Sequence, residues 1–333
     1  MAKNFLIVKF SSFGDIVNAL PAVEHLKRCY PDSRINWVVK ESYVGLLKDC
    51  PFVDNIIAYE DNGIRGLLDV LKKVRALKVD TVIDLQGVLR SALVGYLSGA
   101  PVRVCFPHTR EGSRLFYTHI MGKERNGTHA VLENLSVVEE LTGQALGKSP
   151  AFAIPVDKAE LERARALLNG VSEKEGPRVV VSPTSRWKTK MWDGRKFATL
   201  CDMIIDEYDA TVVFTGVESD TPYIEKIQAM MKHTSINLSG KTDIAALKGL
   251  IKGADLVISC DSGTMHLASA LGSPVVAIFG PTDPAYTGPF TEKRVVVRKT
   301  VDCAPCRRRE CEDMRCMNLI EPEDVMQGVR RLL

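Results

Sequence analysis

The sequence has no hydrophobic run long enough to cross a membrane. A spanning helix needs about 18 or more consecutive apolar residues, and no stretch of the 333 residues approaches that length. The opening MAKNFLIVKF also lacks the apolar core of roughly 7–15 residues that defines a signal peptide. These absences predict a cytoplasmic protein, whose nine cysteines would stay reduced. The net charge of +3 is too small to indicate a nucleic-acid partner.

Three common cofactor and metal motifs are missing as well. No G-x-G-x-x-G follows the first expected strand, and neither G-x-x-x-x-G-K-[ST] nor H-E-x-x-H occurs anywhere. The first two motifs hold nucleotide phosphates in glycine-rich loops, and the third binds zinc. A simple NAD site and a P-loop are therefore unsupported.

What the chain does contain is a regular alternation of short Val/Ile/Leu-rich runs with longer helical patterns. Continuous apolar runs are typical of parallel strands buried on both faces, connected by right-handed helical crossovers. The pattern predicts an α/β protein of two doubly wound, Rossmann-like domains, residues 1–155 and 156–333, which would face each other across a cleft. Strands are expected at 5–10, 35–39, 55–59, 81–86, 102–106, 179–183, 211–216, 236–240, 256–261, 275–280 and 294–298, and helices at 65–78, 128–143, 194–208 and 243–254.

Ligands of such sheets bind beyond the carboxyl ends of the strands, so the strand-end loops are the places to search. The loop that begins at Asp261 reads DSGTMH and leads into a helix. Free backbone N–H groups there, with the hydroxyls of Ser262 and Thr264, would form an anion site. The alternative is that Asp261 or Ser262 only caps the helix. A second small-residue loop, FGPTDP, favours phosphate binding, whereas His266 could be a ligand or a core residue.

Two further strand-end loops of the second half support the same interpretation. In SPTSRWKTKMW, Thr184 and Ser185 supply hydroxyls, and Lys190 supplies a positive charge suited to phosphate. A solvated basic loop is the alternative, but the two tryptophans would be costly on a purely exposed loop. Glu218 follows another strand end and could accept hydrogen bonds from ribose hydroxyls. The second half is therefore interpreted as a nucleotide-diphosphate-binding domain.

The first half places a single acid, Asp15, directly after its first strand, in VKFSSFGDIVNALPA. This carboxylate could merely cap the following helix. Because Pro21 lies inside the helical pattern, we expect an irregular helix start in which Ser11, Ser12 and Gly14 form a tight, exposed turn. A carboxylate held on such a turn would suit a general base.

Four segments together resemble the ADP-heptose:lipopolysaccharide heptosyltransferases, which are inverting enzymes of glycosyltransferase family 9 with the two-domain GT-B fold. They are VKFSSFGDIVNALPA, DLQGVLRS, SPTSRWKTKMW and CDSGTMHLASALGSPVVAIFGPTDP. The resemblance implies transfer of a heptose from ADP-L-glycero-D-manno-heptose to the inner core of lipopolysaccharide, with Asp15 as catalytic base and Lys190 beside the donor phosphates. The candidate donor-binding residues are Thr184, Ser185, Lys190, Glu218, Asp261, Ser262, Gly263, Thr264 and His266, and the candidate acceptor-binding residues are Ser11, Ser12, Arg65, Arg110 and His129.

The same resemblance bears on cofactors and partners. No D-x-D-like acid pair stands in either strand-end site, so neither a metal nor another cofactor is expected; a lysine and a helix N-terminus would stabilise the pyrophosphate leaving group. The implied acceptor carries Kdo carboxylates and lipid A phosphates. Basic residues such as Arg103, Arg110 and Arg114 could dock this acceptor, and they could also favour peripheral contact with the anionic inner membrane.

The tail of the chain departs from the pattern of the Kdo-acceptor enzymes. CAPCRRRECEDMRC contains Cys303, Cys306, Cys311 and Cys316, which could be structural thiols or a zinc or iron–sulfur site. The departure leaves open whether the acceptor is Kdo, a first heptose or another sugar. Two other functions also stay open, namely another GT-B sugar-nucleotide enzyme (a different glycosyltransferase or a nucleotide-sugar epimerase) and a non-catalytic binder.

Overall fold

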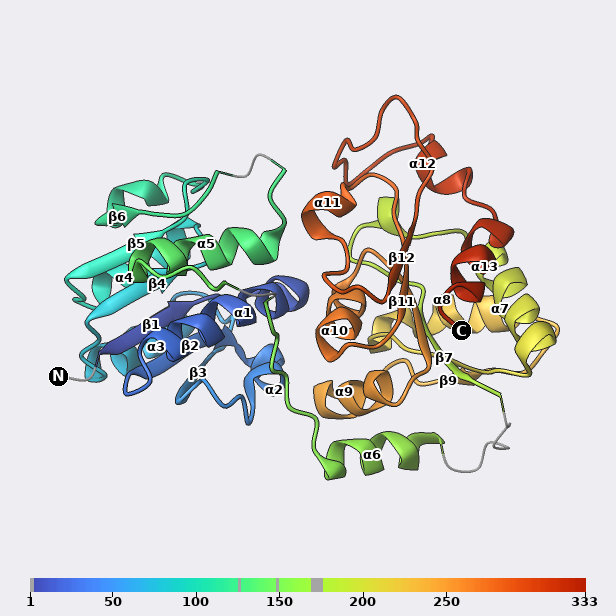
Figure 1. Cartoon of the computed structure of the whole chain (residues 1–333), viewed down its shortest axis with the longest axis horizontal. Helices are drawn as coiled ribbons and strands as arrows, with labels where there is room; N and C mark the ends of the chain where they lie inside the picture. The colour runs from blue at the N-terminus through green and yellow to red at the C-terminus, as the bar shows by residue number, and fades with distance from the viewer. Residues whose placement is uncertain (1–2, 125–126, 148–149, 169–175) are drawn as a thin grey trace. The chain divides into compact units, whose positions relative to one another are not determined.

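The structure is a computed structural model that describes residues 3–124, 127–147, 150–168 and 176–333. It divides into two compact units, Met1–Pro155 (unit 1) and Val156–Leu333 (unit 2). Each unit contains a six-stranded sheet with helices packed against it (Figure 1). All the strand pairs described are parallel, as expected where helices connect successive strands. The predicted fold class of two Rossmann-like α/β domains is confirmed.

The sheet of unit 1 has the strand order β3-β2-β1-β4-β5-β6, the doubly wound order in which the direction of winding reverses beside β1. Its strands are β1 (Asn4–Val8), β2 (Arg34–Lys40), β3 (Asn55–Tyr59), β4 (Thr81–Asp84), β5 (Val102–Cys105) and β6 (His119–Ile120). The central strands are buried along almost their whole length, which explains why they appear in the sequence as continuous apolar runs. The edge strand β6 was not expected, because a two-residue strand has no periodicity to detect.

The helices of unit 1 include one correction to the sequence-based expectations. They are α1 (Phe13–Cys29), the 3₁₀ turn η1 (Glu41–Tyr43), α2 (Val44–Leu47), α3 (Ile64–Ala76), α4 (Leu89–Leu97), η2 (Ser113–Phe116) and α5 (Ala130–Thr142). The expected irregular start of α1 is wrong, because the helix begins at Phe13 and continues through Pro21. An internal proline costs a helix about 3 kcal/mol, but Pro21 is buried, and burial of its ring helps to offset that cost.

Unit 2 repeats the design with the strand order β12-β11-β10-β7-β8-β9. Its strands are β7 (Arg178–Ser182), β8 (Thr211–Phe214), β9 (Ile236–Asn237), β10 (Leu256–Cys260), β11 (Val275–Ile278) and β12 (Arg294–Val297). Its helices are α6 (Lys158–Leu168), η3 (Lys188–Lys190), α7 (Gly194–Tyr208), η4 (Glu218–Asp220), α8 (Thr221–Gln228), α9 (Ile244–Lys252), α10 (Gly263–Leu271), α11 (Pro284–Thr287), α12 (Arg315–Asn318) and α13 (Pro322–Arg330). Because the strands are parallel, the loops that follow β7, β8, β10 and β11 lie at one edge of the sheet.

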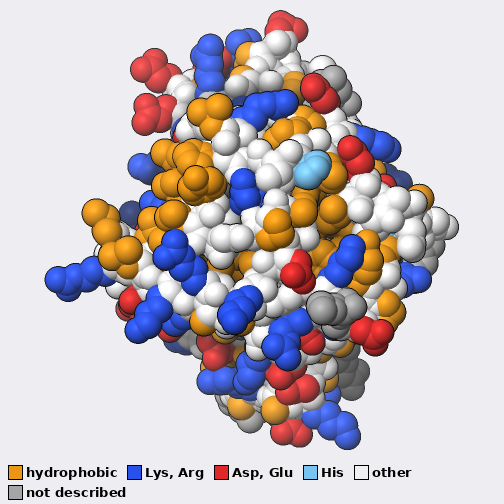
Figure 2. Space-filling view, turned by 90° about the vertical axis from the view of Figure 1, so that its left-hand side faces the viewer, with side chains coloured by type: hydrophobic (Ala, Val, Ile, Leu, Met, Phe, Trp, Pro, Cys, Tyr) orange, Lys and Arg blue, Asp and Glu red, His pale blue; other side chains and the backbone are white. Residues whose placement is uncertain are grey.

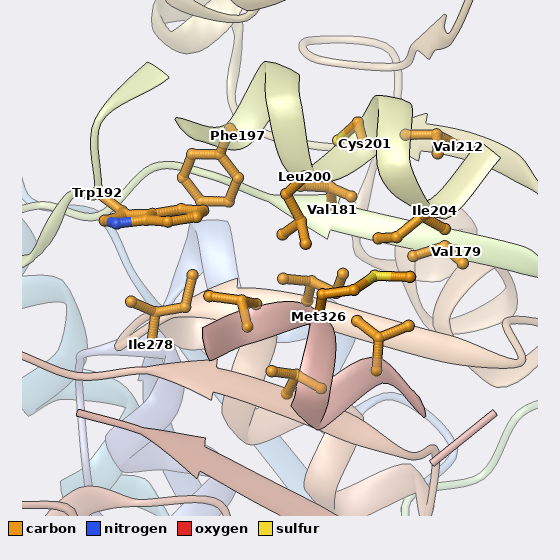
Figure 3. Packing of buried hydrophobic residues seen from close by; sticks show 14 of the residues in the cluster. Val179, Val181, Trp192, Phe197, Leu200, Cys201, Ile204, Val212, Ile278 and Met326 are labelled. Atoms are coloured by element: carbon orange, nitrogen blue, oxygen red, sulfur yellow. The ribbon is translucent and has the colours of Figure 1, made fainter. Parts of the chain in front are cut away.

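The core of unit 2 fixes one of these loops in place. Figure 3 shows Phe197, Leu200 and Ile204 of α7 above the sheet, with Trp192 at the end of the row. The Trp192 ring packs edge-on against Phe197 with 5.0 Å between ring centroids. Its Nε1 donates a hydrogen bond of 3.0 Å to the carbonyl of Ile320, shortly before α13. The loop after β7 is therefore anchored by a buried indole.

Two further findings concern the helices and the cysteines of the chain. Among the described residues, no helix has both the length and the apolar character needed to cross a membrane. All nine cysteines are free thiols.

Candidate active site

Asp15 lies in the first turn of α1, where the helix start fixes its side chain. The backbone N–H and the hydroxyl of Ser12 both donate to Asp15 Oδ2, at 3.0 Å and 2.7 Å. This position also favours a negative charge, because the helix dipole is positive at its N-terminus. Asp15 thus contributes to capping the helix, and its side chain nevertheless remains exposed.

The carboxylate of Asp15 lines a pocket in unit 1 with a volume of about 150 Å³. The other lining residues come from the carboxyl ends of β1, β4 and β5 and from α1 and the start of α5. They are Lys9, Asn18, Gln86, Phe106, His108, Arg110, Ala130, Glu133 and Asn134. Amides, acids and potential cations make up most of this lining, which suits a hydroxyl-rich ligand that carries negative charge.

Charged groups in the pocket are held in defined positions. Lys9 is buried, and its ammonium donates a 2.5 Å hydrogen bond to the carbonyl of Leu85. His108 Nδ1 lies 2.8 Å from Glu133 Oε1, and the Glu133 side chain is almost fully buried. The imidazole also stacks on Phe106, with 3.9 Å between ring centroids. A buried carboxylate needs such a partner, because an isolated charge away from water is costly.

A fully buried acid, Asp84, shapes the turn that brings Gln86 to the pocket. Asp84 Oδ1 accepts hydrogen bonds from the N–H groups of Gln86 (2.8 Å) and Gly87 (2.9 Å), and Oδ2 accepts one from the Tyr117 hydroxyl (2.7 Å). Burial raises the pKa of Asp84, although these hydrogen bonds lower it in part. Desolvation also raises the pKa of Tyr117, and the nearby Asp84 charge adds to that rise.

The candidate acceptor residues are dispersed. Arg110 lines the Asp15 pocket, but Arg65 is exposed on α3 outside it. His129 caps α5, since its Nδ1 accepts a 3.2 Å hydrogen bond from the N–H of Val131. Ser12 holds Asp15, and the Ser11 N–H donates to Gln86 Oε1 at 3.2 Å. Sequence reasoning did not select Asn18, His108, Glu133 or Asn134, because a helix-face amide or a paired acid has no local signature.

In unit 2, three strand-end loops meet at one carboxylate. Lys190 Nζ lies 2.7 Å from Asp261 Oδ2, and the Thr282 hydroxyl donates to the same oxygen at 2.6 Å. The Ser185 hydroxyl donates to the Asp261 carbonyl at 2.9 Å. The Asp261 residue is only 5% exposed, so the lysine supplies the charge partner that burial demands. Thr282 belongs to the FGPTDP loop that the sequence singled out, but its role in holding Asp261 was not foreseen.

Small polar residues form the helix start that follows Asp261. Ser262 is the N-cap residue, and α10 begins at Gly263. Hydroxyl contacts join Ser262 to Ser259 at 2.9 Å and Thr264 to Ser182 at 3.2 Å. His266 is buried in the first turns of α10, on the core side of the helix.

The remaining donor candidates lie at the ends of β7 and β8. The Thr184 hydroxyl donates to Asp220 Oδ2 at 2.9 Å, and the Val217 N–H donates to the same oxygen at 2.9 Å. Glu218 is exposed in η4, beside Gly240. A Cβ at Gly240 would lie 3.0 Å from Glu218 Cα, so glycine permits this close approach. Asp220 was not predicted, since its partner Thr184 comes from a different strand end.

The structure also bears on the metal interpretation of the cysteine-rich tail. Within the part of the chain that the structure describes, no group of three or more His, Cys, Asp or Glu side chains is arranged to hold a metal ion. Cys303 and Cys311 are exposed, whereas Cys316 is buried. Desolvation raises the pKa of the Cys316 thiol, and the neighbouring thiols contribute to that rise.

Two Rossmann-like units in one chain agree with the two-domain GT-B class of glycosyltransferases. Residues 67–316 match the model of glycosyltransferase family 9 (heptosyltransferase), and the chain belongs to that family.

Relatives of known type cover nearly the whole chain. The lipopolysaccharide core heptosyltransferase OpsX of Haemophilus influenzae is 26% identical over 299 residues, which span 89% of this chain and 84% of OpsX. The structure of Escherichia coli ADP-heptose lipopolysaccharide heptosyltransferase II matches with a TM-score of 0.84 and 22% identity, covering 99% of this chain and 98% of that one. E. coli heptosyltransferase WaaC with ADP matches with a TM-score of 0.77 and 21% identity, covering 99% and 100%. The two structural matches establish a shared fold.

Proposed function

We propose that this protein transfers a heptose from ADP-L-glycero-D-manno-heptose to the inner core of lipopolysaccharide with inversion, and that Asp15 is the general base. The observation that carries the proposal is the Asp15 carboxylate, held by Ser12 and exposed in a polar pocket of unit 1. Family membership and the names of the matched relatives support the sugar and the acceptor class.

The chemistry assigned to Asp15 is the removal of one proton. An acceptor hydroxyl in the pocket gives its proton to the carboxylate while its oxygen attacks the anomeric carbon of the heptose. The attack comes from the face opposite the nucleotide, so one C–O bond forms as the bond to ADP breaks and the configuration inverts. Because Asp15 Oδ2 already accepts two hydrogen bonds from Ser12, the carboxylate is oriented before the substrate arrives.

Unit 2 would hold the donor and stabilise the leaving group. The charge that develops on the departing diphosphate needs preorganised donors. Lys190 supplies a cation, and the start of α10 supplies backbone N–H groups beside Ser262 and Thr264. In this assignment Asp261 positions the lysine, since their side chains lie 2.7 Å apart.

The lining of the Asp15 pocket supports an anionic acceptor. Lys9 and Arg110 bring positive charge to it, and the amides of Asn18, Gln86 and Asn134 can bind sugar hydroxyls. Both a Kdo residue and a phosphorylated heptose fit this chemistry. Comparing acceptors with and without the first heptose distinguishes these two substrates.

We further propose peripheral contact with the cytoplasmic face of the inner membrane, through α3 and η2 of unit 1. Large apolar side chains are exposed there, with Ile64 at 76%, Leu68 at 57% and Leu115 at 89%. Both elements contact α4, and Arg65 and Arg114 lie next to these apolar residues in the sequence. Figure 2 shows Lys and Arg side chains spread over the face seen from the left of Figure 1, among hydrophobic side chains. Each basic residue near an anionic surface contributes about 1 kcal/mol of attraction.

A vesicle assay tests the membrane proposal. The wild-type protein should co-sediment with vesicles that contain an anionic phospholipid, and Leu115→Glu should weaken this binding. Binding that is equal for the two proteins would contradict the assigned surface.

A transfer assay tests the function itself. Purified protein, radiolabelled ADP-heptose and Kdo-lipid A should yield labelled lipid. Isomerisation of the nucleotide sugar without transfer would instead indicate an epimerase, and binding without turnover would indicate a non-catalytic protein.

A further inference from the structure

The cysteine-rich segment near the end of the chain contacts the loops of unit 2 that contain the candidate donor residues. We call residues 303–311 the tail loop. The N–H of Arg307 donates a 2.8 Å hydrogen bond to the carbonyl of Pro281, in the loop after β11. The Thr189 hydroxyl, in the loop after β7, donates a 2.8 Å hydrogen bond to the carbonyl of Arg308. The tail loop is therefore attached to two of the loops that form the donor site.

Close packing of the residues that follow the tail loop also attaches this part of the chain to the loop after β11. Cys316 and Met317 of α12 are buried against Gly280, at the start of the FGPTDP loop. A Cβ at Gly280 would lie 2.3 Å from Met317 Sδ and 3.1 Å from Cys316 Sγ, so only a glycine allows this approach. The segment from Arg307 to Met317, which contains Arg309, is thus held at both ends by contacts with the donor loops.

The side chains of Arg309 and Lys190 both lie near the ring of Trp187. The Arg309 guanidinium carbon lies 5.0 Å from the centroid of the Trp187 ring, and Lys190 Nζ lies 4.5 Å from the same centroid. Lys190 is balanced by Asp261 at 2.7 Å. Arg309 is exposed. Among the residues that the structure describes, no carboxylate forms an ion pair with its guanidinium group. The positive charges of Lys190 and Arg309, both held near the Trp187 ring, form a site that favours a multiply charged anion.

We propose that Arg309 binds the diphosphate of the sugar-nucleotide donor together with Lys190. A guanidinium can make two parallel hydrogen bonds to phosphate oxygens, whereas a lysine acts as a point charge. The Trp187 ring limits the directions that Arg309 can take, so less side-chain freedom is lost on binding. This inference rests on the proposed function, because it assumes a nucleoside diphosphate donor.

The test compares ADP binding by calorimetry for the wild-type protein, Arg309→Ala and Arg308→Ala. Arg308→Ala is the matched control, since it removes the same charge from the same loop while the Arg308 carbonyl still accepts from Thr189. We expect Arg309→Ala to weaken ADP binding about tenfold, as for loss of one charge-assisted phosphate contact. Arg308→Ala should weaken it less than about twofold, as screened surface charges do. Adenosine, which has no phosphate, should bind both variants and the wild type equally.

The outcomes separate this inference from the function on which it rests. If the wild type binds ADP and Arg309→Ala binds it equally well, the Arg309 assignment is wrong and the proposed function stands. If Arg309→Ala and Arg308→Ala weakened ADP binding equally, the effect would be one of general charge, and the assignment of Arg309 would again be wrong. Weaker adenosine binding by Arg309→Ala would show contact with the base rather than the diphosphate. If the wild type binds no ADP, the proposed donor and the assignment fail together. Thermal unfolding of each variant checks that the fold is intact.

Discussion

Replacing Asp15 by asparagine removes the proposed base while changing little else. Asparagine has nearly the same shape, and its amide oxygen can still accept the hydrogen bonds from Ser12 at 3.0 Å and 2.7 Å. The helix start therefore keeps its cap and loses only the favourable interaction of a charge with the helix dipole, worth about 0.3–1 kcal/mol. The free energy of unfolding should fall by no more than this amount.

Turnover should fall far more than stability does. General-base catalysis is worth about 10²–10⁴-fold in rate, which corresponds to roughly 2.7–5.5 kcal/mol of activation free energy. Affinity for ADP should not change, because the candidate donor residues all belong to unit 2. The measurements are single-turnover transfer of labelled heptose, ADP titration calorimetry and chemical denaturation, each made on the same preparation.

Glu24→Gln is the matched control for this experiment. Glu24 lies on the same helix, outside the Asp15 pocket, and pairs with Arg28 at 3.7 Å. The variant removes one negative charge from α1 and should keep turnover within about twofold, since Glu24 does not line the pocket that holds Asp15. If Asp15→Asn also kept turnover within tenfold of the wild type, Asp15 would not be the base. A loss of ADP affinity in place of turnover would move Asp15 to the donor site.

Three further predictions concern unit 2. Lys190→Ala should weaken ADP binding at least tenfold and lower turnover, because it removes the cation beside Asp261; unchanged calorimetric affinity would exclude it from the donor site. EDTA should leave transfer intact, since lysine and helix N–H groups are assigned to the leaving group; activity that EDTA abolishes and Mg²⁺ restores would contradict this mechanism. Iodoacetamide at pH 8 should label Cys303 and Cys311 and spare Cys260, because burial raises the pKa of Cys260 to about 12; labelled Cys260 in peptide mass spectra would refute its burial.

Local patterns in the sequence predicted much of the framework. The strand Asn55–Tyr59 and the helix Gly194–Tyr208 have the expected bounds, because apolar periodicity and flanking turn residues are properties of short segments. Asp15, Lys190 and Asp261 could be selected as candidates for a related reason, since each follows a predicted strand of a parallel sheet.

Features that depend on packing were missed or misjudged. The course of α1 through Pro21 depends on the burial of that residue in the folded unit, which no local rule describes. The pairing of His108 with Glu133 joins a loop to a helix face, and the contact of Thr184 with Asp220 joins two strand ends. Such partners become visible only when the chain is folded.

The sequence by itself determined the alternation of strands and helices, and with it the loops in which polar side chains would gather. It could do so because hydrogen bonding and side-chain periodicity act over a few residues. Only the tertiary structure decided which of those side chains touch: Asp261 with Lys190 and Thr282, and Arg309 with the ring of Trp187. These contacts join segments far apart in the chain, and the folding of the sheet and the burial of its core set their distances.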